Sequence, residues 1–143
     1  KFITDEIMES GLNPAKICFE ITETAAINDL ESAAKFMHKL KSMGCQFALD
    51  DFGSGLSSFS YLKKLPFDFL KIDGEYIQKM NENRVNYAIL ETINQIGHVF
   101  GAKTVAEYVE SEELLEQLRK MGVDYAQGYA ITKPTPLKEI FSK

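Results

Sequence analysis

The sequence predicts an α/β fold in which helices cover a parallel β-sheet. Short runs rich in aromatic and β-branched residues alternate along the chain with longer segments of helical spacing. The short runs are mostly hydrophobic throughout, as in parallel strands covered on both faces. Three of the helical segments end at a Gly shortly before a strand, which is typical of αβ loops.

Five apolar runs are predicted to be strands. The first two, "KICFEIT" and "CQFALDD", combine Cys, Phe, Ile and Leu, which suit a buried pleated surface. The five predicted strands are residues 16–22, 45–51, 68–73, 103–108 and 124–129.

Three longer segments show the i, i+3, i+4 apolar spacing of helices that pack against a sheet. Residues 28–44 carry such a stripe from Leu30 to Met43, and Asn28 or Asp29 can cap its start. Residues 83–101 and 111–122 repeat the pattern. A shorter helical turn is expected over 55–65, and the first ten residues read as part of a helix.

The number of units sets a limit on the architecture. A closed (β/α)₈ barrel needs eight units and about 250 residues, whereas these 143 residues hold about five units. We therefore expect either an open sheet or the later part of a barrel. The chain begins without Met in what reads as mid-helix, so we interpret residues 1–143 as a fragment of a larger unit.

Composition indicates one soluble globular unit, since 45% of the residues are hydrophobic and 26% are charged. The net charge of −5 argues against a nucleic-acid polymer as partner. Cys18 and Cys45 lie in apolar runs, so buried free thiols and a reducing, cytoplasmic location are expected. No signal peptide or membrane span is visible, although the full-length protein could carry an anchor elsewhere.

Polar side chains gather at the ends of the predicted strands. Because the carboxyl ends of parallel strands share one face of the fold, we expect these side chains to converge there. In chain order they are Glu20 and Glu23, Asp50 and Asp51, Lys71 and Asp73, Glu107 with Glu110 just beyond, and Gln127.

A cluster of carboxylates needs counter-charge, because adjacent like charges repel and are costly to desolvate. Both histidines, His38 and His98, lie on predicted helices, which leaves oxygen ligands suited to Mg²⁺ or Mn²⁺. Asp50 and Asp51 can serve two neighbouring ions that act on a phosphoryl group. Lys71 is the only cation at these strand ends and can hold a water or neutralise a phosphate.

Each residue also has a simpler interpretation. Glu110 can be a solvated charge, Asp51 can belong to the Gly-Ser-Gly turn, Lys71 can be a surface lysine, and Asp73 can cap a helical turn. The recurrence of polar residues at the same end of five successive strands favours a functional site.

Four motifs resemble those of the EAL domain, a family of bacterial phosphodiesterases that hydrolyse cyclic di-GMP. They are "FEITET", "ALDDFGSGLSSFSYLKKLPFDFLKID", "TVAEYVES" and "GVDYAQGYAITKP", in order and over nearly the whole chain. The resemblance implies a TIM-like (β/α)₈ barrel of EAL type, here incomplete, and hydrolysis of cyclic di-GMP to linear pGpG with two Mg²⁺ or Mn²⁺ ions.

The resemblance also implies roles for individual residues. Glu20, Asp50 and Asp51 match metal ligands, and Lys71, Asp51 and Glu107 match catalytic positions. Supporting residues are Glu23, Asp73 and Gln127, of which Glu23 matches a glutamate that steadies the loop after Asp51. That loop contributes to pairing of two barrels in the family, so a homodimer or other self-association is expected. The resemblance assigns no residue to substrate binding.

Departures from the family pattern leave alternatives open. The Glu-Ala-Leu motif and a following Asn, both metal ligands in the family, are absent from these residues, so we expect weak activity or none from the isolated chain. Tyr108 stands where the family usually has Gly. The alternatives to an enzyme are a cyclic di-GMP receptor that does not hydrolyse its ligand and a dimerising regulatory module. Sensory or GGDEF domains are expected upstream in the full-length protein.

Overall fold

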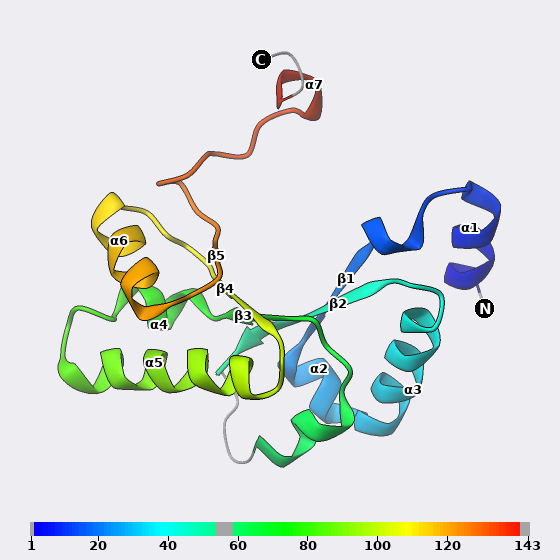
Figure 1. Cartoon of the computed structure of the whole chain (residues 1–143), viewed down its shortest axis with the longest axis horizontal. Coiled ribbons are helices and arrows are strands. Elements are labelled where there is room, and N and C mark those ends of the chain that lie inside the picture. Colours follow the sequence, from blue (N-terminus) through cyan, green and yellow to red (C-terminus); the bar gives the residue numbers. More distant parts are fainter. Residues whose placement is uncertain (1, 54–58, 141–143) are drawn as a thin grey trace.

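A computed structural model describes residues 2–53 and 59–140. Five parallel strands form one sheet in the order β1-β2-β3-β4-β5, so each strand pairs with the next along the chain. This confirms the predicted parallel α/β arrangement (Figure 1). The strands are β1 (Cys18–Thr22), β2 (Gln46–Phe52), β3 (Phe69–Ile72), β4 (Lys103–Ala106) and β5 (Tyr125–Ala126).

Helices connect successive strands and cover the sheet, while the carboxyl-terminal segment runs away from the sheet toward α7 (Figure 1). The helices are α1 (Phe2–Ser10), α2 (Glu23–Asn28), α3 (Leu30–Lys41), α4 (Gly74–Gln78), α5 (Arg84–Val99), α6 (Glu112–Met121) and α7 (Leu137–Ile140). Two 3₁₀ segments, Pro14–Lys16 and Phe59–Lys64, complete the described elements. The first residues of the helical turn expected over 55–65, and Ser54 and Gly55 of the Gly-Ser-Gly turn, lie outside the described residues.

Side-chain caps fix where the long helices begin. The Asp29 carboxylate accepts a hydrogen bond from the Ser32 amide at 3.2 Å, and the Ser111 hydroxyl accepts one from the Leu114 amide at 3.2 Å. Asn83 caps α5 in the same way. Gly122 ends α6 with φ of 82°, a left-handed conformation that Gly adopts without steric cost.

The core lies between the sheet and the helices. Its fully buried large side chains include Phe47, Phe52, Met37, Leu40, Leu49, Leu62, Leu70, Ile72, Ile77, Met80, Leu90 and Ile93. One expectation about burial is wrong. Cys45 is buried, but Cys18 is exposed, because β1 is at the edge of the sheet and every second residue of β1 faces outward. Both thiols are free. In the part of the chain that the structure describes, no helix has the length and apolar character to cross a membrane.

Asp124 ties together the amino-terminal ends of β4 and β5 and the end of α5. Its carboxylate accepts hydrogen bonds from the Thr104 amide at 2.9 Å and from the Lys103 ammonium at 2.8 Å, and it contacts His98 Nε2 at 2.8 Å. Burial opposes ionisation of this carboxyl, but Lys103, Thr104 and His98 outweigh it and hold the Asp124 pKa well below its usual range. This network lies at the amino-terminal ends of the strands, opposite to the carboxyl-terminal rim where Glu20, Asp50, Lys71 and Glu107 lie.

Candidate active site

Lys71 is the centre of a charged cluster at the carboxyl ends of the strands. Its side chain, on β3, is only 8% exposed and contacts one carboxylate from each of three other strand ends. The ammonium nitrogen lies 3.0 Å from Glu20 on β1, 3.0 Å from Asp50 on β2 and 2.9 Å from Glu107, which directly follows β4. The structure therefore brings together four of the residues that the sequence singled out.

An irregularity in the pairing of β2 with β3 places both Asp50 and Asp51 at this cluster. Leu49 is paired with Leu70 and Phe52 with Ile72, so Asp50 and Asp51 together lie opposite the single residue Lys71. Successive residues of a regular strand point to opposite faces, whereas a bulge re-aims a side chain. Asp51 has φ of 53°, a left-handed backbone that is rare for residues other than Gly. Two adjacent carboxylates thereby serve one site.

The carboxylates of Asp50, Asp51 and Glu107 offer oxygen atoms that all lie within 4.8 Å of one another. With Glu20 they make four negative charges against one positive charge on Lys71, a formal sum of −3. Such a set of hard oxygen donors with uncompensated negative charge fits a divalent cation of the Mg²⁺ or Mn²⁺ type. These residues are therefore a candidate metal centre.

Burial and neighbouring charges shift the pKa values of three members of the cluster, namely Lys71, Glu107 and Asp51. Burial works against the charged form of Lys71, but hydrogen bonds to Glu107, Asp50 and Glu20 outweigh it and raise the Lys71 pKa. Burial raises the pKa of Glu107 in spite of Lys71. The pKa of Asp51 is raised by partial desolvation and then by the negative charges of Asp50 and Asp73. Lys71 is thus a fixed cation, whereas Asp51 and Glu107 hold protons more readily than ordinary carboxyls.

Glu23 is placed differently from the expectation that it ends the first strand. It is the first residue of α2 and is fully buried, because Thr22 caps the helix and turns the chain away from the sheet. Its carboxylate accepts a hydrogen bond from the Gly53 amide at 2.9 Å and another from the Tyr61 hydroxyl. Glu23 therefore touches the chain two residues beyond Asp51. The sequence assigned no role to Tyr61, because no local pattern indicates which carboxylate its hydroxyl reaches.

Asp73 and Gln127 lie at the rim and make different contacts. The Asp73 carboxylate accepts a hydrogen bond from the Glu75 amide at 2.8 Å and caps α4, as the simpler interpretation proposed. Gln127 follows the two-residue β5, which is shorter than the predicted 124–129 because the chain then folds over the segment after β4. The backbone carbonyl of Gln127 accepts a hydrogen bond from the Val109 amide at 3.1 Å.

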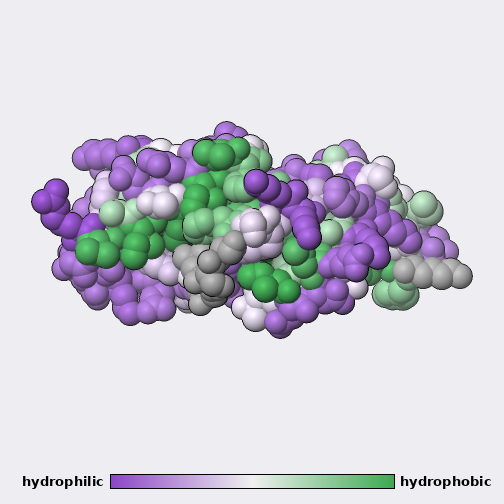
Figure 2. All heavy atoms as spheres, turned by 90° about the horizontal axis from the view of Figure 1, so that it is seen from below, coloured by the Kyte–Doolittle hydropathy of each residue, from purple (hydrophilic) through white to green (hydrophobic). Residues whose placement is uncertain are grey.

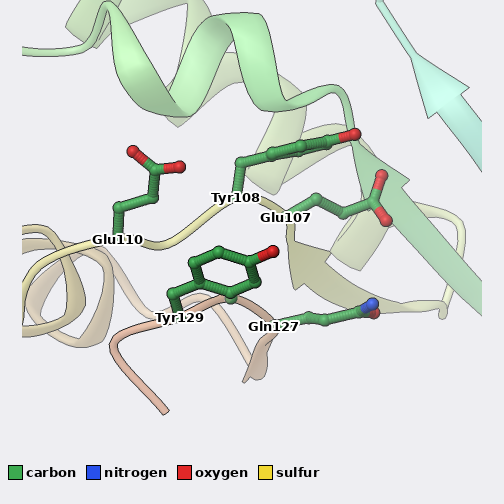
Figure 3. Close-up of a pocket in the computed structure, with 6 residues that line it drawn as sticks. Glu107, Tyr108, Glu110, Gln127 and Tyr129 are labelled. Atoms are coloured by element: carbon green, nitrogen blue, oxygen red, sulfur yellow. The ribbon is translucent and has the colours of Figure 1, made fainter. Parts of the chain in front are cut away.

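A cleft of about 310 Å³ opens beside Glu107. Figure 3 shows the rings of Tyr108 and Tyr129 facing this cleft, with Glu110 and Gln127 at its borders. Tyr108 has φ of 53°, which explains in physical terms why Gly suits this position. Its ring lies close over Gly74, where an added Cβ would come within 2.2 Å of the Tyr108 ring. The sequence left Glu110 open between a member of the polar cluster and a solvated charge, and it assigned nothing to Tyr129.

Comparisons with known proteins agree with these features. The family model described as "EAL domain" matches residues 2–134. Over 121 residues the chain is 46% identical to "Cyclic di-GMP phosphodiesterase PdeB" of Shewanella oneidensis, covering 85% of this chain and 14% of that protein. Over 136 residues it is 40% identical to "Cyclic di-GMP phosphodiesterase PdeA" of Borreliella burgdorferi, covering 95% of this chain and 20% of that protein.

A third relative has both a curated name and a solved structure. "Bifunctional diguanylate cyclase/cyclic di-GMP phosphodiesterase MucR" of Pseudomonas aeruginosa is 32% identical over 140 residues, 98% of this chain and 20% of that protein. The structure "PaMucR Phosphodiesterase, c-di-GMP complex" superposes with a TM-score of 0.91 at 33% identity, covering 96% of this chain and 56% of that one. The chain therefore spans a fifth or less of the length of these three curated relatives.

Proposed function

The chain belongs to the EAL domain family, and from this membership we propose that it forms part of a metal-dependent phosphodiesterase that hydrolyses cyclic di-GMP to linear pGpG. The observation that carries the proposal is the contact of one buried lysine, Lys71, with carboxylates from three other strand ends. A structural ion pair needs one partner, whereas this arrangement keeps excess negative charge around a fixed cation.

The residues present fit a pair of Mg²⁺ or Mn²⁺ ions. We propose Glu20, Asp50 and Asp51 as ligands, since Asp50 and Asp51 lie next to each other with oxygen atoms close to those of Glu107. When bound, such ions lower the pKa of water and stabilise negative charge on a phosphate.

The chain's own residues then divide the work. Lys71 stays protonated because its pKa is raised, so it donates hydrogen bonds that orient the attacking water and neutralise charge on the phosphate. Asp51 or Glu107, whose pKa values are raised, accepts the proton that the water loses. The water oxygen bonds to phosphorus, one P–O bond of the ring breaks, and the departing oxygen takes up a proton. Glu23, Asp73 and Gln127 support the rim.

The cleft beside Glu107 is the proposed position for one base of the dinucleotide. The Tyr108 and Tyr129 rings offer aromatic faces on which a base stacks, and stacking of a base on an aromatic side chain contributes about 1–3 kcal/mol. Glu107 lines the same cleft and joins it to the catalytic cluster.

We propose that residues 1–143 are the carboxyl-terminal part of a single EAL domain. The share of the solved MucR chain that they cover, 56%, supports this. Within the described residues β1 and β5 each pair on one side only, as expected if further strands complete a barrel. The family's Glu-Ala-Leu glutamate and the following Asn would then complete the ligands, and the 143 residues alone would hydrolyse poorly.

Partners of the parent protein are proposed on the same basis. MucR combines a diguanylate cyclase with a phosphodiesterase, which supports an upstream GGDEF or sensory domain here. A cytoplasmic location is proposed because the proposed substrate is a nucleotide second messenger. Self-association is proposed because Val85, Tyr87 and Val99 of α5 are exposed and apolar patches interrupt the hydrophilic surface seen from below (Figure 2). Light scattering that shows only monomer would count against self-association.

The test uses the intact EAL domain that contains this chain. Incubation with cyclic di-GMP and Mn²⁺ should yield pGpG by liquid chromatography, and chelation should abolish the product. Lys71→Met should reduce turnover at least 100-fold, with circular dichroism checking that the variant is folded. Turnover unchanged by Lys71→Met would refute the catalytic assignment. Calorimetric binding of cyclic di-GMP without product would instead identify a receptor.

A further inference from the structure

The irregular backbone at Asp50 and Asp51 is held from its carboxyl-terminal side. Asp51 adopts a left-handed conformation that is uncommon for residues other than Gly, so contacts around it contribute to holding it. Phe52, which follows, is fully buried and re-enters the pairing with Ile72. The next residue, Gly53, is where polar contacts from two other elements meet.

Both backbone polar groups of Gly53 are engaged by side chains. Its amide donates to the buried Glu23 carboxylate at 2.9 Å, and its carbonyl accepts a hydrogen bond from the Tyr76 hydroxyl at 2.7 Å. Glu23 belongs to α2, which precedes β2 in the sequence, and Tyr76 belongs to α4, which follows β3. Gly53 is therefore held by side chains from two different helices.

Packing reinforces the contact with Tyr76. Gly53 has φ of 109°, and a Cβ at this position would lie 2.6 Å from the Tyr76 ring and 3.2 Å from Ile93. The ring of Tyr76 therefore lies directly against the Gly53 backbone, in addition to the hydrogen bond from its hydroxyl. Burial raises the Tyr76 pKa, followed by Asp73 and Glu75, so the hydroxyl keeps its proton for this bond.

We propose that Tyr76 is a positioning residue: its hydroxyl, through the Gly53 carbonyl, holds the bulge that aims both Asp50 and Asp51 at the cation site. The inference rests on the function proposed above, because it concerns the same carboxylates. Among the residues that the structure describes, the hydrogen bond of the Tyr76 hydroxyl goes to Gly53, and Tyr76 does not line the cleft, so its effect reaches the site through the backbone of residues 51–53. It acts together with Glu23, which holds the other polar group of Gly53.

Tyr76→Phe in the intact EAL domain tests this, since it removes one oxygen and keeps the ring that packs on Gly53. The first readout is amide hydrogen exchange followed by mass spectrometry. Loss of one hydrogen bond should speed exchange of the amides at residues 51–53 about fivefold, which corresponds to about 1 kcal/mol. The second readout is the Mn²⁺ dissociation constant from calorimetry, which should rise about fivefold while the KM for cyclic di-GMP changes little.

Tyr125→Phe is the matched control, because Tyr125 is exposed on β5 and its ring contacts Phe69 at the start of β3, away from the bulge. It should leave both readouts at the wild-type values. A merely structural Tyr76 would instead speed exchange throughout the sheet and leave Mn²⁺ affinity unchanged, which would overturn the proposal. Unchanged exchange at residues 51–53 would also overturn it. A wild-type domain that binds no Mn²⁺ would refute the proposed function, and the role of Tyr76 would then be decided by the exchange data alone.

Discussion

Replacing Asp124 by Asn should lower the free energy of unfolding by about 2–3 kcal/mol at pH 7. The carboxylate is 18% exposed and accepts hydrogen bonds from the Thr104 amide at 2.9 Å and from the Lys103 ammonium at 2.8 Å. Hydrogen bonds to a charged group contribute about 1.5–3 kcal/mol, whereas bonds between neutral groups contribute about 0.5–1.5 kcal/mol. Asn keeps a carbonyl oxygen that can accept from the Thr104 amide, but the negative charge is lost and an NH₂ group replaces the second accepting oxygen. We assign most of the loss to the weakened bonds from Thr104, because the Lys103 side chain is 60% exposed and its charge is screened by solvent.

The pH dependence follows from the depressed pKa of Asp124. The unfolded chain takes up a proton at this carboxyl near its ordinary value of 3.8, whereas the folded chain resists protonation to lower pH. The contribution of the carboxylate is therefore present in full above about pH 5 and is lost as the pH falls through 3.8 toward the folded-state pKa. The difference between wild type and Asp124→Asn should be constant from pH 5 to 8 and should narrow below pH 4.

Urea denaturation of the intact domain, followed by circular dichroism at pH 7, 5 and 3.5, measures this difference. Thermal unfolding at pH 7 should show a midpoint lower by about 5–10 °C for a domain of 150–250 residues. Lys103→Met serves as the control for the exposed ion pair and should have a much smaller effect. A difference below 1 kcal/mol at pH 7, or one that stays the same at pH 3.5, would refute the account of the Asp124 network.

Two further predictions concern the cleft and its wall. Tyr108→Gly should raise the KM for cyclic di-GMP about tenfold because an aromatic face is lost. The stability of the domain should change little, because relief of the left-handed strain at φ of 53° largely offsets the lost packing on Gly74. Steady-state kinetics with an unchanged KM would contradict the cleft assignment. Gly128→Ala should destabilise the domain by about 1–3 kcal/mol and lower kcat, because the new Cβ would lie 2.3 Å from the Val109 amide nitrogen, two residues beyond Glu107. A Gly128→Ala domain with wild-type melting temperature and turnover would show that this segment moves aside freely.

The elements with long periodic patterns could be predicted from the sequence. The apolar stripes and caps of α3, α5 and α6 depend on local spacing, and local spacing is what a sequence displays. The convergence of Glu20, Asp50, Lys71 and Glu107 could also be predicted, because parallel strands put their carboxyl ends on one face.

Features that depend on contacts between distant segments could not be predicted. The register shift at Asp50 and Asp51 is a relation between β2 and β3, and the apolar pattern of either strand alone does not contain it. The six-residue helix α2 is too short to show a period, so Glu23 was assigned to a strand end. The sequence assigned no role to Tyr61 or Tyr76, because it does not show which carbonyl or carboxylate a phenol hydroxyl reaches.

The shift of register between β2 and β3 has a consequence for protein engineering. A designer who copied the aspartate pair onto an idealised barrel with a uniform ladder would turn one carboxylate toward the helices, however faithful the amino-acid choice. Deleting either aspartate from the natural chain should likewise restore ordinary pleating and leave half of the acidic pair. The transferable unit is therefore a short backbone irregularity together with the residues that brace it.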